Sequence, residues 1–527
     1  MIPRTPMTRL PEAVLGLLLA VLLAACARLP TEPAPRAEVL PDAVTATSAL
    51  ASRVRAAGAS HGSDSGILLL DSGREAFLER VALIEAAERS IDAQYYIWNS
   101  DTTGRYIAAR LYAAAERGVR VRLLLDDINV GGRDDVLALL DQHPNIEIRI
   151  YNPALQRSGL RWAFDFLREF SRLNRRMHNK SFTVDGSVTI LGGRNIGDEY
   201  FDAHPVLNFR DRDVAAVGPV VADTGRMFDA FWNSALARPV TEFGNGVRAG
   251  ALESRAERAA ADAARLAALF GALPQGAAAG LAHIEASVDA MHWAPARLVY
   301  DGPPNGAALA DSTVTQASAA ALWGMATAAR EEFLIESAYL VLDQESVDAL
   351  RAMHERGVRV RALTNSLASN DVTANHAAYA RRREAILGGG VELYEMRPDA
   401  ASCRGLVLNG AACGEGHVFG LHAKTFVFDR RTVYVGSLNL NLRSRFLNAE
   451  SGLVIESPEL AARIAADIEL NMAPANSWRV VADGRGRARW IEGEGDAAVT
   501  LRREPQAPWS RRARATLIAL LPLEKYL

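Results

Sequence analysis

Two stretches of the sequence are nearly identical and lie far apart: residues 113–127 read AAAERGVRVRLLLDD, and residues 352–366 read AMHERGVRVRALTNS. They share the string ERGVRVR and begin 239 positions apart. In each copy, apolar residues at helical spacing end at a glycine and a β-branched strand follows. Another strand precedes each helix, at 91–98 and 333–340. Strand, helix, strand is a βαβ unit, so we expect two α/β sandwich halves, each built on a largely parallel or mixed sheet.

Length and composition agree with a globular protein. The chain has 527 residues, of which 49% are hydrophobic and 23% charged, which is typical of about three domains and excludes a disordered, collagen-like or multi-pass membrane protein. A net charge of -3 gives no general attraction for polyanions, so nucleic-acid binding would need a local basic patch. Three cysteines are too few for a disulfide scaffold.

The amino terminus has the features of a signal. Arg4 and Arg9 precede an apolar run of 13 residues at 13–25, which is too short to span a bilayer comfortably. The following Leu23-Ala-Ala-Cys26 resembles a bacterial lipobox, which implies cleavage before Cys26 and lipidation of its sulfur. The alternative is an uncleaved anchor. Either way we expect a cell-envelope protein that faces the periplasm or the exterior, and Ala27 favours the outer membrane by resemblance to Gram-negative sorting.

Composition along the chain predicts the domain boundaries. Residues 247–290 are dominated by Ala, Arg and Glu and predict a helical connector outside the repeat, and 27–65 are rich in Pro, Ala and Ser. We predict a signal peptide at 1–25, a flexible tether at 26–65, a first α/β domain at 66–238, a helical connector at 239–295, a second α/β domain at 296–475 and a C-terminal tail at 476–527.

A second repeated pattern carries the chemistry. Copy one is His178-Asn-Lys180-Ser-Phe-Thr-Val-Asp185 followed by Gly192-Gly-Arg-Asn195, and copy two is His422-Ala-Lys424-Thr-Phe-Val-Phe-Asp429 followed by Gly436-Ser-Leu-Asn439. The His, Lys, Asp and Asn positions recur at one constant offset of 244. Two of the three lysines in the chain, Lys180 and Lys424, occupy the same slot; the third is Lys525. Such agreement excludes coincidence and predicts that a mobile ammonium is required there.

Strand geometry suggests how the pattern works. Residues two apart in a strand share a face, so His178 and Lys180 should project together, as should His422 and Lys424. Asp185-Gly186 is a strong hairpin signal, and the returning strand would bring Asn195 back beside them. Copy two has Asp429-Arg-Arg in this place, which predicts a loop of a different form.

The doubled HxKx4Dx6G(G/S)xN pattern resembles the phospholipase D superfamily, whose members carry paired HKD motifs. The resemblance implies two tandem phospholipase D-like α/β sandwich domains related by a pseudo-twofold, with one metal-independent and cofactor-free phosphodiester site at their seam. One histidine would attack phosphorus and form a phosphohistidine, while the other would protonate the leaving alcohol and then deprotonate the acceptor. By analogy with members in which the amino-terminal copy attacks, His178 is favoured as nucleophile. Lys180, Lys424, Asn195 and Asn439 would hold the non-bridging oxygens.

The superfamily places a carboxylate behind each histidine. Glu450 stands at the head of a predicted strand, and Asp213 opens its counterpart in copy one, with Asp211 as a rival. Asp185 and Asp429 belong to the motif but lie in turns, so we interpret them as structural. Of the other histidines, which show no metal-ligand spacing, His376 follows a predicted strand end and is a candidate substrate contact. Cys403 and Cys413 could form a local disulfide or remain unpaired.

Several features point towards lipid. Residues 160–177 are basic with aromatics at helical spacing, which predicts either a helix packed on the core or one lying on anionic lipid beside the active-site entrance. Residues 509–527 are also basic and then apolar, and could pack on a domain or touch the surface. Residues 92–98, 101–104, 143–147, 151–153 and 369–379 and the Leu-Leu-Pro-Leu-Glu tail resemble the bacterial cardiolipin synthase C-like branch. That resemblance implies phospholipid substrates, a membrane surface and no nucleic acid.

Three hypotheses follow from the sequence. The first is a phosphatidyltransferase that makes cardiolipin or a related lipid. The second is a hydrolytic phospholipase D that releases phosphatidic acid, because the same residues serve either acceptor. The third is a nucleic-acid phosphodiesterase, which the acidic balance and the predicted lipid tether disfavour. The sequence leaves the acceptor and the oligomeric state open.

Overall fold

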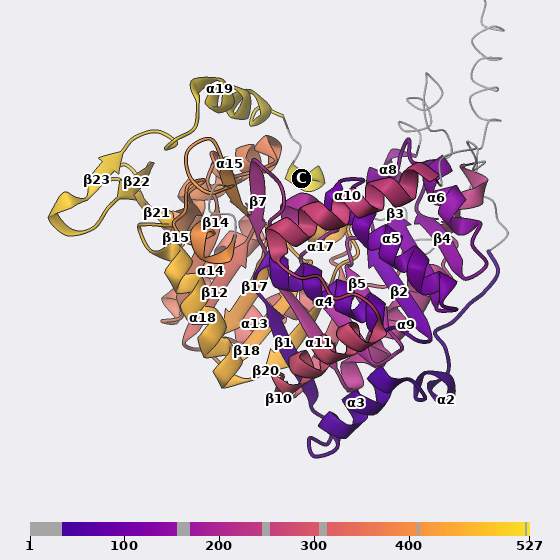
Figure 1. The fold of residues 1–527 in the computed structure, drawn as a ribbon. Helices are drawn as coiled ribbons and strands as arrows, with labels where there is room; N and C mark the ends of the chain where they lie inside the picture. Colours follow the sequence, from indigo (N-terminus) through magenta and orange to yellow (C-terminus); the bar gives the residue numbers. More distant parts are fainter. Residues whose placement is uncertain (1–33, 155–168, 245–252, 305–312, 408–411, 522–523) are drawn as a thin grey trace, which may run out of the picture.

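The computed structural model describes residues 34–154, 169–244, 253–304, 313–407, 412–521 and 524–527. The predicted signal peptide and the predicted lipidation site, Cys26, lie outside the described residues. Each half of the chain forms one large mixed sheet with helices on both faces, and the two halves lie side by side (Figure 1). The predicted fold class is therefore confirmed: two tandem α/β domains.

The first sheet has nine strands. Its neighbouring strands β2, β3 and β4 are parallel, as the βαβ pattern predicted, and the remaining pairs are antiparallel. Helix α5 (Thr102–Glu116) makes the crossover from β2 to β3. In spatial order the strands are β10 (His292–Ala294), β1 (Ser65–Leu70), β8 (Asp213–Val217), β6 (Val188–Gly192), β5 (Ser181–Val184), β2 (Ser90–Tyr95), β3 (Arg120–Asp126), β4 (Ile146–Tyr151) and β9 (Ala237–Pro239).

The second sheet repeats this order. Strands β12, β14 and β15 are parallel, and helix α14 (Gln344–Glu355) makes the crossover from β12 to β14. In spatial order the strands are β11 (Ala296–Tyr300), β20 (Ser451–Glu456), β18 (Thr432–Gly436), β17 (Lys424–Phe428), β12 (Glu332–Ser337), β14 (Arg359–Asn365), β15 (Glu392–Met396), β21 (Ser477–Ala482), β22 (Ala488–Glu492) and β23 (Val499–Leu501). The two HKD-containing strands, β5 and β17, therefore occupy equivalent places.

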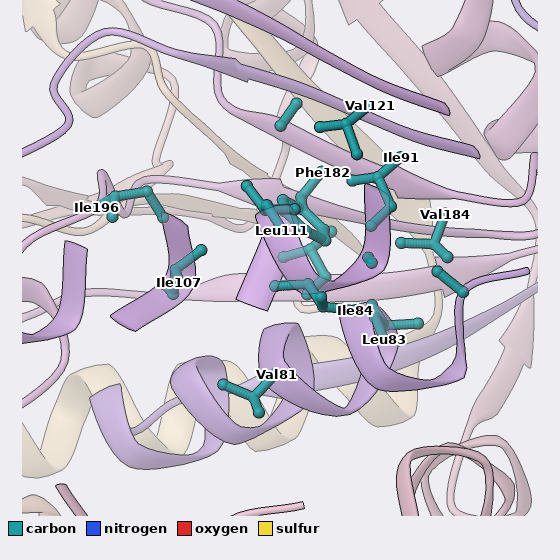
Figure 2. Packing of buried hydrophobic residues seen from close by; sticks show 14 of the residues in the cluster. Val81, Leu83, Ile84, Ile91, Ile107, Leu111, Val121, Phe182, Val184 and Ile196 are labelled. Atoms are coloured by element: carbon teal, nitrogen blue, oxygen red, sulfur yellow. The ribbon is translucent and has the colours of Figure 1, made fainter. Parts of the chain in front are cut away.

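Helices cover each sheet on both sides. In the first half, α4 (Gly73–Ala86), α5 and α11 (Ala277–Asp289) pack on one face, where Val81, Leu111 and Phe182 meet in a common core (Figure 2). Burying each such side chain stabilises the fold by about 1.5–3 kcal/mol relative to exposure. Helices α13 (Ala317–Ala328), α14 and α15 (Thr373–Gly388) cover the corresponding face of the second sheet.

The opposite faces of the two sheets share one core. Helices α9 (Pro219–Trp232) and α18 (Pro458–Met472) contribute to it, and buried residues of both halves form a single cluster that includes Val214 and Phe228 from the first and Val433 and Leu453 from the second. The halves are thus joined by a continuous apolar core, which fixes their relative position at the seam where the motifs lie.

Two of the predicted boundaries are wrong. Within the predicted tether, α3 (Ala49–Gly58) is a capped helix that packs on the first domain and buries Leu50 completely. The predicted tail begins with β21, which pairs with β15 and buries Trp478. Because an open strand edge exposes unpaired backbone groups, covering β15 with β21 continues the second sheet in the way that β9 covers β4 in the first. The predicted connector contains α10 (Glu253–Phe270) and α11 and ends in β10, which joins the first sheet.

Candidate active site

A short ribbon between the halves positions the second motif. Strand β7 (Leu207–Arg210) pairs in parallel with β16 (Val418–Leu421), so that Arg210 lies opposite Leu421. The next residues are Asp211 and His422, and Nδ1 of His422 lies 2.5 Å from Oδ2 of Asp211. The backbone N–H of His422 also donates to the carbonyl of Arg210 at 2.8 Å. The ribbon therefore delivers a carboxylate of the first half to the histidine of the second.

The first motif is positioned in the same way. Met177 and Ala449 form an isolated parallel bridge between the halves, and the backbone N–H of His178 donates to the carbonyl of Ala449 at 2.8 Å. The next residue on the partner segment is Glu450, whose Oε2 lies 2.7 Å from Nδ1 of His178. Each motif histidine is thus paired with a carboxylate of the opposite half, and neither domain holds a complete pair by itself.

Of the two candidates for the carboxylate of the first half, the rival Asp211 and not the preferred Asp213 contacts a motif histidine. Asp213 does not contact a motif histidine but forms a buried ion pair with Arg80 at 2.8 Å. In the sheets Gly192 lies opposite Asp213 and Gly436 lies opposite Gly452, so the counterpart of Asp213 is Gly452. Asp211 and Glu450 are 239 positions apart, the same offset as the ERGVRVR strings, which is the signal that could have identified Asp211 from the sequence.

The motif residues form one buried group at the seam. Lys180 Nζ donates to the carbonyl of His178 at 2.5 Å, and Lys424 Nζ donates likewise to the carbonyl of His422. Asn195 Oδ1 accepts the backbone N–H of Ile97 at 3.1 Å. The residues of this group are each at most 7% exposed: His178, Lys180, Asn195, Asp211, His422, Lys424, Asn439 and Glu450.

Burial keeps both histidines neutral. It lowers the pKa of His178 and outweighs the charge of Glu450, while the Lys180 and Lys424 ammonium groups lower it further. Burial and the Lys424 charge lower the pKa of His422 as well. For Glu450, burial would raise the pKa, but the His178 and Lys180 contacts outweigh it and the pKa falls. Each pair therefore rests as a neutral imidazole beside an ionised carboxylate, which leaves Nε2 free of a proton when Nδ1–H donates to the carboxylate.

Burial acts against the charged form of both motif lysines. Burial lowers the pKa of Lys180 well below its ordinary value, and the Lys424 charge adds to this effect. Burial lowers the pKa of Lys424 to about 8, against the charges of Asp211 and Asp371. A bound phosphodiester anion between the two would reverse this effect, because an opposite charge favours the protonated amine. The site is therefore built to take an anion.

Sequence reasoning missed the hydrogen bonds that hold Glu450. Its carboxylate accepts from Ser437 Oγ at 2.5 Å, from Ser444 Oγ at 2.6 Å and from Asn448 Nδ2 at 3.2 Å. Its backbone N–H donates to Asp301 Oδ2 at 2.9 Å. These neutral donors fix the carboxylate in one orientation and favour its ionised form.

The position of Ser437 explains a difference between the motif copies. The corresponding residue of copy one is Gly193, and a Cβ atom there would lie 2.1 Å from Oδ1 of Asp211. Copy one therefore needs glycine at this position, whereas copy two has Ser437, which donates a hydrogen bond to Glu450. The G(G/S) alternation in the motif was the available signal.

Aromatic side chains stand beside both histidines. The ring of Tyr96 lies 4.8 Å from the ring of His178, and Tyr200 and Phe209 lie 5.1 and 5.2 Å from the ring of His422. The tyrosines meet the imidazoles edge-on and Phe209 is tilted against His422, and these contacts exclude water from the sides of the imidazole rings.

The two motif aspartates hold equivalent turns. The Asp185 carboxylate accepts backbone N–H groups of Glu88, Arg89 and Ser90, and that of Asp429 accepts those of Arg330, Glu331 and Glu332. We predicted that the loop of copy two would differ in form from the Asp185-Gly186 turn of copy one, and this prediction is wrong. Val184 pairs with Val188 and Phe428 with Thr432, so each turn has the same register, and Arg430 adopts a φ of 50° where copy one has Gly186. The aspartate contacts impose this shape despite the cost of a left-handed residue.

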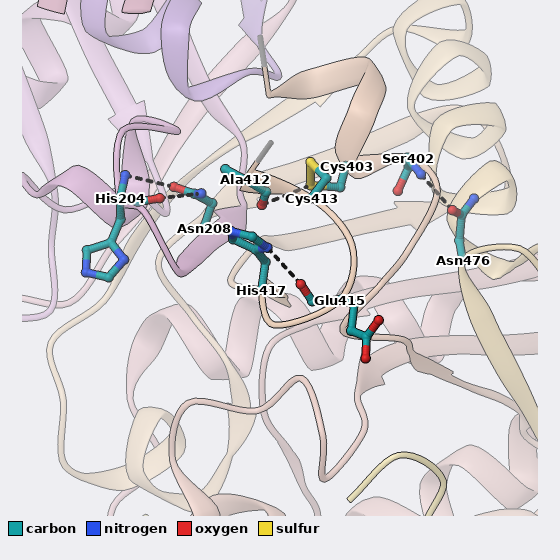
Figure 3. Close-up of a disulfide and its surroundings, with 9 residues drawn as sticks. All are labelled: His204, Asn208, Ser402, Cys403, Ala412, Cys413, Glu415, His417 and Asn476. Atoms are coloured by element: carbon teal, nitrogen blue, oxygen red, sulfur yellow. Dashed lines mark hydrogen bonds between the residues drawn. A yellow bond between two sulfur atoms is a disulfide. The ribbon is translucent and has the colours of Figure 1, made fainter. Parts of the chain in front are cut away.

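The remaining candidates lie apart from the histidine pairs. Cys403 and Cys413 form a disulfide, which lies near Asn208 of β7 and His417 (Figure 3). A cavity of about 350 Å³ opens nearby, lined by His204, Arg265, Ala412 and His417 among others and by none of the motif residues. His376 is 1% exposed and its Nε2 lies 3.3 Å from Glu504, so it contacts an internal carboxylate and is not accessible for the predicted substrate contact.

Three further findings concern other predictions. The first half of the basic stretch at 160–177 lies outside the described residues, and in the second half Arg176 is buried and pairs with Asp126 at 3.0 Å. Across the residues that the structure describes, no group of three or more His, Cys, Asp or Glu side chains could hold a metal ion. In the same part of the chain, no helix has the length and apolar character needed to cross a membrane.

Comparison with known proteins identifies the family. A model described as "Cardiolipin synthase, PLD-like domain" matches residues 81–232 and 323–471, more than half of the chain. Cardiolipin synthase C of Escherichia coli K12 is 40% identical over 480 residues, covering 90% of this chain and 99% of that protein. Cardiolipin synthase A of Pseudomonas entomophila is 27% identical over 395 residues, covering 74% of this chain and 64% of that protein.

A solved structure shares the fold. The crystal structure of phosphatidylserine synthase from Haemophilus influenzae Rd KW20 aligns with a TM-score of 0.55 at 15% identity and covers 90% of this chain and 100% of that one. The family match covers both halves, each with its own copy of the motif, and the sequence relationship extends over nearly the whole chain. The chain therefore belongs to the cardiolipin synthase family of proteins with phospholipase D-like domains.

Proposed function

We propose that this protein is a phosphatidyltransferase that moves a phosphatidyl group, through a phosphohistidine, to the headgroup alcohol of a second phospholipid. One observation carries the proposal: each histidine of the duplicated motif is paired with a carboxylate of the other half, with both lysines in the same buried group. A pair of oriented imidazoles beside two cations suits a two-step displacement at an anionic phosphodiester. Its relative in E. coli is named for cardiolipin synthesis.

In the first step His178 is the nucleophile. Its unprotonated Nε2 attacks phosphorus, a P–N bond forms, and the bond from phosphorus to the leaving headgroup oxygen breaks. His422 gives a proton to that oxygen, so that a neutral alcohol departs. The resting His422 is neutral, and the charge of the bound phosphodiester raises its pKa towards the protonated state that this step needs. Asp211 stabilises the imidazolium from behind.

The second step reverses the first with a new alcohol. Neutral His422 removes the proton from the acceptor hydroxyl, whose oxygen attacks phosphorus as the P–N bond to His178 breaks. Lys180 and Lys424 stabilise the charge on the non-bridging oxygens, with the amides of Asn195 and Asn439 as further donors. Each ammonium has three N–H donors and uses one on a backbone carbonyl, so it can bind phosphate without leaving its place.

The predicted cell-envelope location is part of this proposal. A lipid attached at Cys26 would tether the catalytic domains to the outer side of a membrane, where phospholipid is at hand. The disulfide between Cys403 and Cys413 supports an oxidising compartment, since such bonds rarely persist in the cytosol. Replacing Cys26 by Ser should abolish incorporation of labelled palmitate and release the protein from the membrane fraction; retention of both would refute the anchor.

The deciding experiment is mass spectrometry of lipids after incubation with phosphatidylglycerol/phosphatidylethanolamine vesicles. We expect new cardiolipin, with loss of activity in His178→Ala and in His422→Ala. Release of phosphatidic acid alone would make the protein a hydrolase instead. If the wild type leaves every lipid unchanged, the lipid proposal fails and labelled oligonucleotides become the next substrates to test.

The roles of the two histidines can be separated. With an activated diester, whose leaving group needs no proton, His422→Ala should still form the covalent intermediate, visible by intact-protein mass. His178→Ala should form none. Adduct formation in His178→Ala but not in His422→Ala would reverse the assignment.

A further inference from the structure

We infer that the C-terminal helix α19 (Trp509–Ile518) and the turn after it are the surface that docks this protein onto an anionic phospholipid bilayer. The inference rests on the proposed function, because it explains how a lipid headgroup reaches a buried site. It assigns the contact to residues that the catalytic chemistry does not use.

Large apolar side chains of this segment face away from the protein. Trp509, Leu517 and Leu520 are 76%, 66% and 77% exposed, and Leu521 is 51% exposed. Positions 509, 513 and 517 follow helical spacing, so they lie on one side of the helix, and Leu520 and Leu521 follow directly after the helix ends. Contiguous exposed apolar surface of this kind marks an interaction site.

The opposite side of the helix packs on the second domain through small residues. Ala515 is buried in a cluster with Ala507, Leu367 and Ala377, and Ile518 and Ala519 pack against it. Successive residues turn by about 100°, which places Ala515 and Ile518 roughly opposite the exposed stripe. An ordinary surface helix buries its large apolar residues, whereas α19 buries alanines and exposes leucines.

One end of the segment is tied to the loop that supports the second motif. Arg511 donates to the carbonyls of Ala368 and Asn370. This loop begins at Asn365, whose side chain hydrogen-bonds both backbone groups of Leu421 at 2.7 and 2.8 Å. Leu421 immediately precedes His422, so α19 lies one loop away from a catalytic histidine.

The C-terminal residues that follow the helix contact residues close in sequence to both motifs. Arg443, four positions after Asn439, donates to the carbonyl of Tyr526 at 3.1 Å and to that of Asn174, four positions before His178, at 3.2 Å. The ring of Tyr526 lies 5.1 Å from that of Phe170. Figure 1 shows α19 on the outer edge above α15, with the C-terminus returning towards α17 (Leu442–Phe446). The C-terminal residues after the helix are thus held by residues that lie four positions from each motif in the sequence.

The charge of the segment selects a bilayer over a protein partner. Residues 505–523 contain three arginines and no acidic residue, and Arg514, one turn from Leu517, is exposed together with Arg502 and Arg503 just before the helix. A tryptophan and leucines flanked by arginines form an interfacial helix that sinks its apolar side into the boundary of anionic lipid.

The test places an environment-sensitive fluorophore on the segment of the full-length, lipidated protein. In vesicles of phosphatidylglycerol and phosphatidylethanolamine, a label at Leu520→Cys should shift to the blue and be quenched by lipids with a spin label in the acyl chain. A label at Leu470→Cys, where the leucine of α18 is 59% exposed, is the matched control and should report water. A water-like signal at both positions would overturn the inference.

A functional comparison separates this inference from the proposed chemistry. Replacing Leu517 and Leu520 by Gln should reduce transfer between lipids in vesicles on the order of tenfold, through loss of apolar contact, and leave turnover of a water-soluble activated diester unchanged. Leu470→Gln should change neither. Unchanged vesicle activity in the double variant would refute the docking surface, as would shielding of the Leu520→Cys label without lipid, which would indicate a second copy of the chain. Failure of the wild type on both substrates would instead refute the proposed function.

Discussion

Replacing Asp211 by Asn should remove activity and leave the fold intact, whereas replacing Asp213 by Asn should do the reverse. Asp211 Oδ2 lies 2.5 Å from Nδ1 of His422, and both side chains are buried. An asparagine can present an N–H to Nδ1, which forces the proton onto Nε2 and blocks the base that the reaction needs. The imidazolium would also lose its counter-charge in a buried site.

The size of the effect follows from these two losses. A tautomer error behind a catalytic histidine, together with loss of the carboxylate charge, costs a factor of about 10⁴ in kcat, or roughly 5 kcal/mol of barrier. Asp213 instead pairs with Arg80, whose side chain is almost fully buried. Removing one charge of a buried pair costs about 3–5 kcal/mol of unfolding free energy, and the similar shape of Asn places the expected loss at the lower end.

Both quantities can be measured on the same preparations. Product lipids are quantified by mass spectrometry and divided by the folded fraction, and unfolding is followed in urea by intrinsic fluorescence. Asp213→Asn should keep turnover per folded molecule within about tenfold of wild type, since its carboxylate touches the backbone of Arg194 but no motif side chain. Equal losses of turnover in both variants, with unchanged stability, would refute the assignment of Asp211 as the partner of His422.

Three further outcomes can be tested. The value of kcat/KM should fall as pH rises through about 8, because burial lowers the pKa of Lys424 to that value and the free enzyme then loses an anion-binding charge; a pH profile of kcat/KM measures this fall, and a profile that stays flat to about pH 10 would contradict it. Asp429→Ala should lower the unfolding free energy by about 2 kcal/mol, because three backbone N–H groups lose their acceptor. Asp185→Ala should lower it by about 3 kcal/mol, because the Asp185 side chain is fully buried. Urea titration measures both effects, and turnover per folded molecule should persist in both variants. Replacing Cys403 and Cys413 together by Ser should lower stability by about 2–3 kcal/mol, and a reductant should lower the melting temperature of the wild type but not of the double variant.

The repeat explains why much of the architecture could be predicted. Helix spacing, a terminating glycine and a β-branched strand are local signals, and they occur twice, so the parallel strands β2, β3, β12 and β14 follow from the sequence. The ends of the sheets were harder to predict. Strand β21 adds to β15 because that edge is open, and helix α3 packs against α11 with Leu50 and Val54 in the shared core. Neither reason is visible in the segment itself.

By itself the sequence determined the two α/β halves and singled out the histidine, lysine and asparagine positions of the candidate site, together with Glu450 as one of its carboxylates. Only the tertiary structure decided that Asp211, and not Asp213, stands behind His422, and that each pair is divided between the halves. The physical reason is register. A shift of one residue in a strand turns a side chain to the other face, and the positions of Asp211 and Glu450 depend on parallel bridges between segments more than 200 residues apart.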